Sequence, residues 1–440
     1  MLQKIKLKMS EDKHLKELVQ GSTSSFLVKT AGMLMSYFVV LYITNNFGAE
    51  AFGAYTIGIT ILSIATLLPK FGMENSLVRI VGELYTNNKL AIIRSVISRS
   101  IIFCLIVSVI VSGILFYTAQ DVASFINQPQ ATLSIKWISM AIIPAAILAI
   151  LAAILQAMRK VVGFSLLSSV LVPSLFLIGM SLSIEKSDVI PIYVYAVYVS
   201  LILGYIAFKI SLPTKGKDKL PAYPFKRIIQ ISFPMLLSGS LVLIMSWTDI
   251  LMLTYFKGEE AVGIYSAAQR IAAITSIGLV AINAISAPKY IQFYANRDFK
   301  GLESIAKQST RLIFFASVPL LLIFILFPKF ILGFLGDEFI VGYIVLILLT
   351  VAQFVNSISG SVGYILQMTD NQTIFQNIIL VAAIINVILN YFLIPLYGIN
   401  GAAFASMVSL IFWNVTMIFY IKSKLGFYTI YLPFTNKIKL

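Results

Sequence analysis

Long apolar runs recur along the chain, separated by shorter polar segments that carry most of its charged residues. Most runs reach about 20 residues, the length that a helix needs to cross a hydrocarbon core of about 30 Å. They are apolar on every face, whereas the strands of a membrane β-barrel alternate apolar and polar residues. The pattern therefore predicts an all-α integral membrane protein with twelve transmembrane helices. We place these spans at residues 22–46, 53–70, 95–118, 133–157, 162–184, 189–211, 228–256, 262–286, 310–335, 339–368, 373–396 and 400–422.

The composition agrees with a membrane protein. Of the 440 residues, 59% are hydrophobic and only 12% are charged, and the mean hydropathy is +0.93. These values lie outside the range of soluble domains. Cys104 is the one cysteine and falls in the third predicted span, so the chain cannot form an intramolecular disulfide.

The net charge of +15 is distributed unevenly between the two ends of the spans. If the N-terminus is cytoplasmic, the segments on that side hold 27 of the 33 lysines and arginines, while acidic residues divide almost evenly. This is the positive-inside bias of membrane proteins. It predicts that both termini are cytoplasmic, and it explains the basic loops through topology without a nucleic-acid partner.

An internal repeat divides the chain into two halves. The motif GAEAFGAY at 48–55 recurs as GEEAVGIY at 258–265, an offset of 210 residues. The stretch ILQAMRKVVGF at 154–164 recurs in part as ILQMTDNQTIF at 365–375, an offset of 211. Two matches at nearly one offset favour duplication over chance similarity.

The duplication predicts the domain organisation. We expect an N-terminal six-helix bundle at 1–211, a cytoplasmic linker at 212–227, and a C-terminal six-helix bundle with a cytoplasmic tail at 228–440. Six spans per half make the repeats parallel, with a central cavity between two pseudo-symmetric bundles. Rocking of one bundle against the other would give alternating access, so a transporter is the first hypothesis.

Asp249, Arg270 and Lys29 are the candidate site residues within predicted spans, where charges are costly and usually functional. Asp249 and Arg270 fall at similar depths in the hairpin of spans seven and eight, so the sequence allows a buried ion pair between them. The alternative is direct contact of either residue with substrate or proton. Lys29 either extends to the cytoplasmic interface or lines the cavity. None has a charged mate at the offset of 210, where Val39, Thr60 and Gly239 stand. This asymmetry favours function over an inherited structural role.

Two further cations and one helix feature are candidates. Arg79 and Lys289 are mates in the repeat, each at the cytoplasmic end of the second span of its half. They either set topology or draw an anionic headgroup toward the inner mouth of a cavity. Pro234 removes a helical hydrogen bond in span seven, and Gly239 follows it, so we expect a kink or hinge there.

The chain resembles the polysaccharide flippase family, the Wzx-type exporters of O-antigen and other lipid-linked oligosaccharides within the multidrug/oligosaccharidyl-lipid/polysaccharide superfamily. The resemblance extends over all twelve spans. It rests on FGAEAFGAY (47–55), FPM (233–235), Asp249 followed by GEEAVGIYSAAQR (258–270), and IPLYGINGAAFAS (394–406).

The resemblance implies a flippase that moves undecaprenyl-diphosphate-linked repeat units across the bacterial inner membrane for surface polysaccharide synthesis. It implies a cationic cavity with cations from spans one and eight, which hold Lys29 and Arg270 here. Polymerase and chain-length proteins of the same pathway are the implied partners, and coupling to protons or sodium is left open. Four polar residues at helical spacing either line the cavity or join helices by hydrogen bonds: Gln353, Asn356, Asn386 and Asn390.

Two other functions compete with this one. An ion-coupled multidrug antiporter of the same superfamily would favour an excess of acidic residues in the spans, whereas here two cations face one carboxylate. A membrane-embedded glycan polymerase or glycosyltransferase would need a general base or metal-binding carboxylates. The only histidine is His14, in the polar N-terminal segment, and we find no Asp-x-Asp motif and no phosphate-binding glycine loop. We therefore predict no catalytic residues, no metal ligands and no cofactor.

Overall fold

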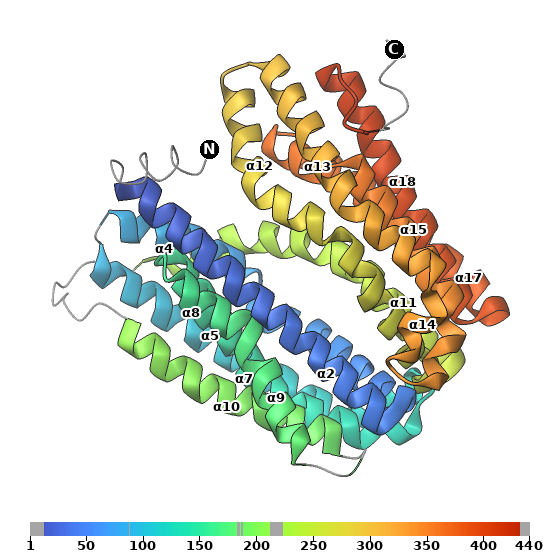
Figure 1. Cartoon of the computed structure of the whole chain (residues 1–440). Helices are drawn as coiled ribbons and strands as arrows, with labels where there is room; N and C mark the ends of the chain where they lie inside the picture. Colours follow the sequence, from blue (N-terminus) through green and yellow to red (C-terminus); the bar gives the residue numbers. More distant parts are fainter. Residues whose placement is uncertain (1–12, 88, 183–184, 186–187, 212–222, 432–440) are drawn as a thin grey trace. The chain divides into compact units, whose positions relative to one another are not determined.

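The structure is a computed structural model that describes residues 13–87, 89–182, 185, 188–211 and 223–431. All regular elements in this part of the chain are helices (Figure 1). In chain order they are α2 (Lys13–Ala65), α3 (Leu67–Lys70), α4 (Met73–Thr86), α5 (Leu90–Tyr117), α6 (Ala119–Phe125), η1 (Pro129–Ala131), α7 (Thr132–Ala157), α8 (Val161–Ser165), the π-helix η2 (Leu166–Val170), α9 (Leu171–Ser181), α10 (Val189–Ser211), α11 (Phe225–Ala273), η4 (Ile274–Ser276), α12 (Ile277–Ala295), α13 (Phe299–Leu326), α14 (Pro328–Gly333), η5 (Asp337–Gly342), α15 (Tyr343–Ser359), α16 (Val362–Met368), α17 (Gln372–Tyr397) and α18 (Ile399–Leu425).

Ten helical stretches of the described chain are long and apolar enough to cross a membrane. Two of them, Thr30–Lys70 and Leu243–Asn283, are 41 residues long, about twice the length of one span. Each is bent at a glycine, α2 at Gly48 and α11 at Gly258. Each bent helix therefore supplies two spans, which gives twelve. The predicted all-α, multi-pass membrane fold is confirmed, while the central cavity stays a prediction.

The two bends reproduce the repeat in the backbone. Gly48 has φ 82° and ψ −174°, and Gly258, 210 residues later, has φ 86° and ψ −174°. A side chain is strongly disfavoured at such positive φ, which explains why both copies of the motif begin with glycine. The sequence motif predicts a tight turn, and the structure makes that turn at a single glycine between two helices that follow each other directly.

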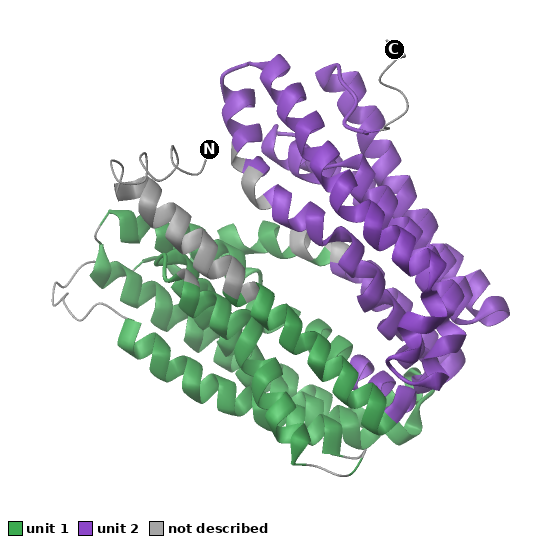
Figure 2. Ribbon diagram, in the orientation of Figure 1, with its two compact units in different colours: residues 1–47, 58–240 green, residues 48–57, 241–440 purple. Residues whose placement is uncertain are grey.

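The chain divides into two compact units, which Figure 2 distinguishes by colour. Unit 1 comprises Met1–Phe47 and Gly58–Ser240, and unit 2 comprises Gly48–Ile57 and Leu241–Leu440. The division in the second half of the chain falls inside α11. Residues 212–222 of the predicted linker lie outside the described part of the structure, and the predicted domain boundaries stay a prediction.

Each unit has an apolar interior of its own. In unit 1, α4, α5 and α7 contribute the fully buried Leu77, Val96 and Leu151. The first part of α11 also belongs to this unit, where the hydroxyls of Ser76 and Ser232 lie 2.6 Å apart in a buried hydrogen bond. In unit 2, the corresponding cluster is built around Tyr290, Leu302, Ile365 and Ile421.

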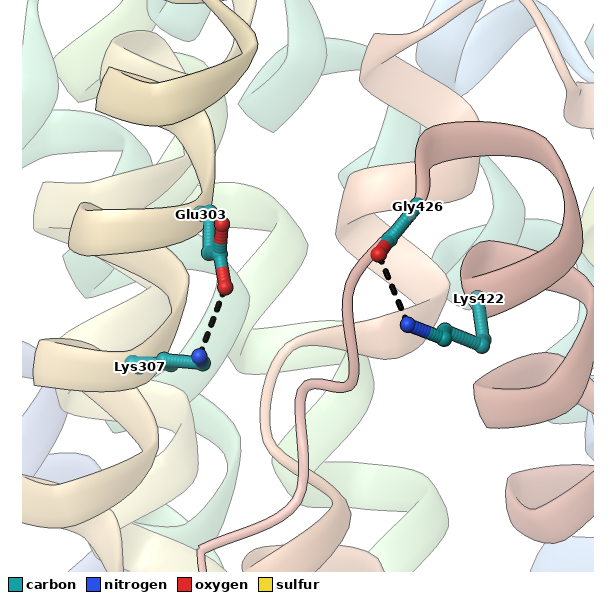
Figure 3. Close-up of polar contacts among 4 residues, drawn as sticks. All are labelled: Glu303, Lys307, Lys422 and Gly426. Atoms are coloured by element: carbon teal, nitrogen blue, oxygen red, sulfur yellow. Dashed lines mark hydrogen bonds and ion pairs between the residues drawn. The ribbon is translucent and has the colours of Figure 1, made fainter. Parts of the chain in front are cut away.

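Polar contacts stabilise the ends of the helices in unit 2 (Figure 3). On α13, Lys307 Nζ lies 2.6 Å from Glu303 Oε1, an i,i+4 pair on an exposed face. In the last turn of α18, Lys422 Nζ donates to the carbonyl of Gly426, the residue that follows the helix, at 2.9 Å. The chain then runs back along the unit, with Phe427 buried and the Tyr431 amide donating to Ile358 O at 3.4 Å. The segment 426–431 is therefore packed into unit 2.

The predicted tenth span, 339–368, is not one helix. It ends as α15 at Ser359, passes through Gly360 (φ 75°), and resumes as α16 at Val362. Ser361, at the break, donates a buried hydrogen bond to Asn283 Oδ1 of α12. The prediction of a continuous span was wrong here. A helix break inside the membrane is possible when its polar groups form hydrogen bonds with neighbouring helices, and hydropathy gives no sign of such a break.

Replacing Gly360 by alanine is expected to destabilise the protein. A Cβ there would overlap the Thr310 side chain, and the positive φ adds about 1–2 kcal/mol of backbone strain. We expect a lower unfolding temperature of the purified protein in detergent. Gly113→Ala in α5 is the matched control, because nothing lies within 4 Å of its Cβ position and alanine favours the helix. Equal unfolding temperatures for Gly360→Ala and wild type would contradict this account of the break.

Candidate functional site

Asp249 lies in α11, nine residues before the bend at Gly258, and only 1% of its surface is exposed. Its carboxylate accepts hydrogen bonds from two hydroxyl groups. Tyr265, which follows the bend in the same helix, donates to Oδ2 at 2.8 Å, and Ser406 of α18 also donates to Oδ2. The chain reverses direction at Gly258, so residues at similar distances before and after the bend lie next to each other. Asp249 and Tyr265 are such a pair, nine residues before the bend and seven after it.

Two amides of α17 complete the cluster, on the other carboxylate oxygen. Asn386 Nδ2 lies 3.2 Å and Asn390 Nδ2 lies 2.6 Å from Asp249 Oδ1. The two asparagines are four residues apart and therefore occupy one face of the helix. Both are fully buried. Among the described residues, Asp249 thus contacts four neutral donors from three spans, all within unit 2, and we call these five residues the Asp249 network.

The ion pair between Asp249 and Arg270 that the sequence allowed is not formed. The predicted loop between spans seven and eight does not exist, because the helix turns at Gly258 alone. Asp249 is then about 14 Å from the bend along its helix and Arg270 about 18 Å. Arg270 also follows Tyr265 by five residues, which turns it about 140° away from the face that meets Asp249. Tyr265 takes the position that sequence reasoning gave to Arg270.

Arg270 instead faces the segment 48–57, which belongs to the same unit. Its guanidinium carbon lies 5.4 Å from the ring centroid of Phe52, within the range of a cation–π interaction. Its charge also acts on the Tyr55 hydroxyl, with which it shares a hydrogen bond. The Arg270 side chain is partly buried.

The other predicted site residues lie elsewhere. Lys29 is in α2 of unit 1, and its side chain lies outside the described part of the structure. One turn later, Gly32 packs against the main chain of Ser169 in the π-helix η2, where a Cβ would be too close. Arg79 on α4 and Lys289 on α12 are exposed. Arg79 belongs to unit 1 and Lys289 to unit 2, and their predicted role at an inner mouth remains a prediction.

The predicted hinge lies next to the division between the units. Pro234 is inside α11, and Gly239 directly precedes the boundary between Ser240 and Leu241. Gly258 is the one residue of α11 whose dihedrals are non-helical. The backbone therefore stays helical through Pro234 and Gly239, and a hinge there stays a prediction.

The repeat shows that the Asp249 network is an addition to unit 2. At the offset of 210 that relates the two bends, Asp249 and Tyr265 correspond to Val39 and Tyr55. At the offset of 211 that relates the second pair of matches, the other three positions correspond to Leu175, Gly179 and Tyr195, so none of the five mates carries a carboxylate or an amide. The first half therefore packs the same helices without a carboxylate or an amide. A polar network that the fold does not need, in a membrane interior where each polar group is costly, is a functional-site candidate.

One acceptor of the network has no hydrogen-bond partner in the described part of the chain. Asn390 donates through Nδ2 to Asp249 and also to Asn386 Oδ1 at 3.1 Å, but its own Oδ1 is buried and accepts nothing. Carboxylate, amide and hydroxyl oxygens are the ligands of hard cations. The network is chemically able to hold a proton on the carboxylate or a small monovalent cation among these oxygens.

Sequence reasoning found part of this network. It singled out Asp249 by its charge and proposed hydrogen bonding between helices for Asn386 and Asn390, which the structure confirms. It missed Tyr265 and Ser406. A signal for Tyr265 was present, because this tyrosine is one of the residues that the two copies of the motif share. Ser406 ends the stretch IPLYGINGAAFAS that contributes to the family resemblance, but its position there does not indicate a contact with Asp249.

Comparison with known proteins places the chain in a family. Residues 18–288 match the family model described as polysaccharide biosynthesis protein, and residues 234–392 match the MatE model. Among curated proteins, the chain is 28% identical over 165 residues to a "Probable low-salt glycan biosynthesis flippase Agl15" of Haloferax volcanii. That match spans 37% of this chain and 35% of the relative.

Solved structures share the fold at low sequence identity. An inward-facing multidrug resistance MATE family transporter of the MOP superfamily has a TM-score of 0.76 at 13% identity, covering 90% of this chain and 94% of the other. The lipid II flippase MurJ, in an inward closed conformation, has a TM-score of 0.74 at 17% identity over 92% and 87%. A MOP superfamily transporter of Pyrococcus furiosus has a TM-score of 0.65 at 14% identity over 93% and 96%. The twelve-span fold is thus that of MOP superfamily transporters, and by the match over residues 18–288 the chain belongs to the polysaccharide biosynthesis protein family.

Proposed function

We propose that the protein is a flippase that moves a lipid-linked glycan across a membrane. The observation that carries this proposal is the match of residues 18–288 to the polysaccharide biosynthesis family. The MurJ fold and the partial Agl15 match agree with it. We further propose undecaprenyl diphosphate as the carrier and O-antigen-like repeat units as the glycan, moved by alternating access in a bacterial inner membrane with both chain termini in the cytoplasm.

The chemistry of Arg270 fits a diphosphate carrier. A diphosphate is a compact anion that leaves the membrane interface only with cations and hydrogen-bond donors, and a guanidinium offers paired donors that match phosphate oxygens. Arg270 is partly buried and is held from one side by Phe52. Lys29, Arg79 and Lys289 are the further cations that we propose for the path of the headgroup. The polyprenyl tail can remain in lipid throughout, because only the polar part of the substrate has to be shielded from the bilayer.

We infer that the Asp249 network couples this movement to a proton or sodium ion. The carboxylate and the unpartnered Asn390 oxygen supply charge and a vacant acceptor, and the hydroxyls of Tyr265 and Ser406 can turn from donating to accepting. Uptake of a cation would therefore rearrange hydrogen bonds between α11, α17 and α18. Contacts that change between four spans of one unit are a physical means of biasing its conformation.

A multidrug antiporter is the second candidate, favoured by the MatE match over residues 234–392. A cationic drug would need an acidic group that it can approach. Asp249 is fully enclosed by neutral donors, whereas Arg270, after the bend of the same helix, is partly exposed. This arrangement favours an anionic substrate and leaves Asp249 for a small ion.

Deletion of the gene in the native host tests the proposed function. We expect lipid-linked oligosaccharide to accumulate on the cytoplasmic leaflet and the surface glycan to be lost, measured by extraction of the lipid-linked pool and by surface lectin labelling. Complementation with the wild-type gene is the control. A normal surface glycan together with new sensitivity to cationic drugs would contradict the flippase proposal and favour the antiporter.

A further inference from the structure

The segment Gly48–Ile57 belongs to unit 2, although the chain on both sides of it belongs to unit 1 (Figure 2). It begins at the bend of α2 and contains the first copy of the repeated motif. Three sets of contacts hold it to the other residues of unit 2. Each uses a different kind of interaction, and one of them involves the cation that the proposed function assigns to the substrate.

The first contact is a carboxylate at the start of the segment. Glu338 of η5 accepts a hydrogen bond from the Ala49 amide, with 2.6 Å between Oε1 and N. Ala49 follows the bend at Gly48, so its N–H belongs to the first turn of the helix after the bend, where amides lack partners in the same helix. A carboxylate at this place satisfies the amide and faces the positive end of the helix dipole.

The second contact is a close approach of two main chains at the glycines of the repeated motif. A Cβ at Gly53 would overlap the carbonyl of Glu259, and a Cβ at Gly263 would overlap the carbonyl of Ala49. Gly53 and Gly263 are mates in the repeat, as are Ala49 and Glu259, so the contact has local two-fold symmetry. Only glycine at both positions allows the helices to pass at this distance, as small residues do at helix crossings in membranes.

The third contact is Arg270, which lies over the Phe52 ring and shares a hydrogen bond with Tyr55. Phe52 is fully buried, so its ring is fixed in place by the packing around it. A phosphate oxygen binds a guanidinium in the plane of its N–H groups. An anion that engages Arg270 therefore competes with Tyr55 for donors and draws the charge away from the ring.

We propose that Gly48–Ile57 is a latch, held on unit 2 by Glu338 and Arg270, and that a diphosphate bound to Arg270 releases it. The release step rests on the proposed function, whereas the holding contacts do not. Phe52, Tyr55 and Glu338 are then positioning residues: they place Arg270 and the segment against each other without contacting substrate. The latch links occupation of the anion site to the departure of one helical segment from unit 2.

The accessibility of a single cysteine reports the state of the latch. The purified full-length protein carries Cys104→Ser to remove its own thiol and Ala51→Cys, a buried position in the segment. We expect slow maleimide labelling in this background and at least tenfold faster labelling when Glu338→Ala is added. Asp337→Ala is the matched control, because this neighbouring carboxylate is also exposed and does not accept from Ala49. Glu338→Gln retains an acceptor for the Ala49 amide and is expected to restore slow labelling, which separates the latch from misfolding.

Inorganic pyrophosphate tests the release. We expect it to accelerate labelling at Ala51→Cys at least several-fold, and to have no effect when Arg270→Ala is added, because that variant is already released. Wild-type labelling rates in both Glu338→Ala and Arg270→Ala would overturn the latch. Pyrophosphate that binds by calorimetry yet leaves labelling unchanged would overturn its release by substrate. If pyrophosphate does not bind while Glu338→Ala still speeds labelling, the latch stands and the diphosphate substrate is contradicted.

Discussion

Replacing Asp249 by asparagine is expected to abolish transport while the protein still inserts and folds. The substitution keeps the volume of the side chain but removes the charge that a coupling ion needs, and it turns one acceptor of the network into a donor among four donors. Hydrogen bonds to a charged group contribute about 1.5–3 kcal/mol each, so the loss of one corresponds to a fall of at least about tenfold in ion affinity. The measurement is recovery of surface glycan in the gene-deletion strain, with protein levels in the membrane fraction alongside.

A matched control for this variant is Asn414→Ala. Asn414 is also fully buried in unit 2, on α18 as Ser406 is, but its amide donates to Leu410 O and does not reach Asp249. We expect it to retain transport. If Asp249→Asn restored surface glycan as well as wild type does, the network would be a packing feature and the coupling proposal would be wrong.

Replacing Arg270 by alanine is expected to reduce transport at least about tenfold, since a charged hydrogen bond to phosphate of about 1.5–3 kcal/mol is lost. Arg270→Lys should recover only part of the activity, because an ammonium keeps the charge but not the paired donors. Arg311→Ala is the control: Arg311 also lies over an aromatic ring, 5.9 Å from the centroid of Phe315, but it is exposed and distant in sequence from the candidate site. Transport at the wild-type rate in Arg270→Ala would remove this residue from the substrate path.

The spans and the duplication could be predicted because both are local properties of the sequence. Hydropathy locates a helix wherever about 20 apolar residues occur in succession, whatever they pack against. The repeated glycines at Gly48 and Gly258 carry the same backbone requirement in each half, a positive φ that excludes other side chains. The break at Gly360 escaped this reasoning because it depends on Thr310 and Asn283, which are distant in sequence.

The partner of Asp249 could not be predicted because it depends on the length of a turn. A loop of five residues would place Arg270 at the depth of Asp249, whereas a turn at one glycine brings Tyr265 there. The predicted helix ends differ from the observed ones by only a few residues. This difference is enough to replace the predicted ion pair with a network of neutral donors and to place Arg270 on another face of the helix. The charge of Asp249 marked the position as functional; the chemistry around it followed only from the fold.

The central claim is that this chain moves an anionic glycolipid and uses Asp249 of unit 2 for ion coupling. Purified protein in proteoliposomes tests it directly, with fluorescent lipid-linked oligosaccharide in one leaflet and an imposed sodium or proton gradient. We predict that wild-type protein, Asn414→Ala and Arg311→Ala transfer the label faster with the gradient than without it. Asp249→Asn is expected not to transfer the label, and Arg270→Ala to transfer it at least about tenfold more slowly than wild type. Gradient-driven transfer at the wild-type rate by Asp249→Asn and Arg270→Ala, or movement of a cationic dye with none of the glycolipid, would contradict the claim.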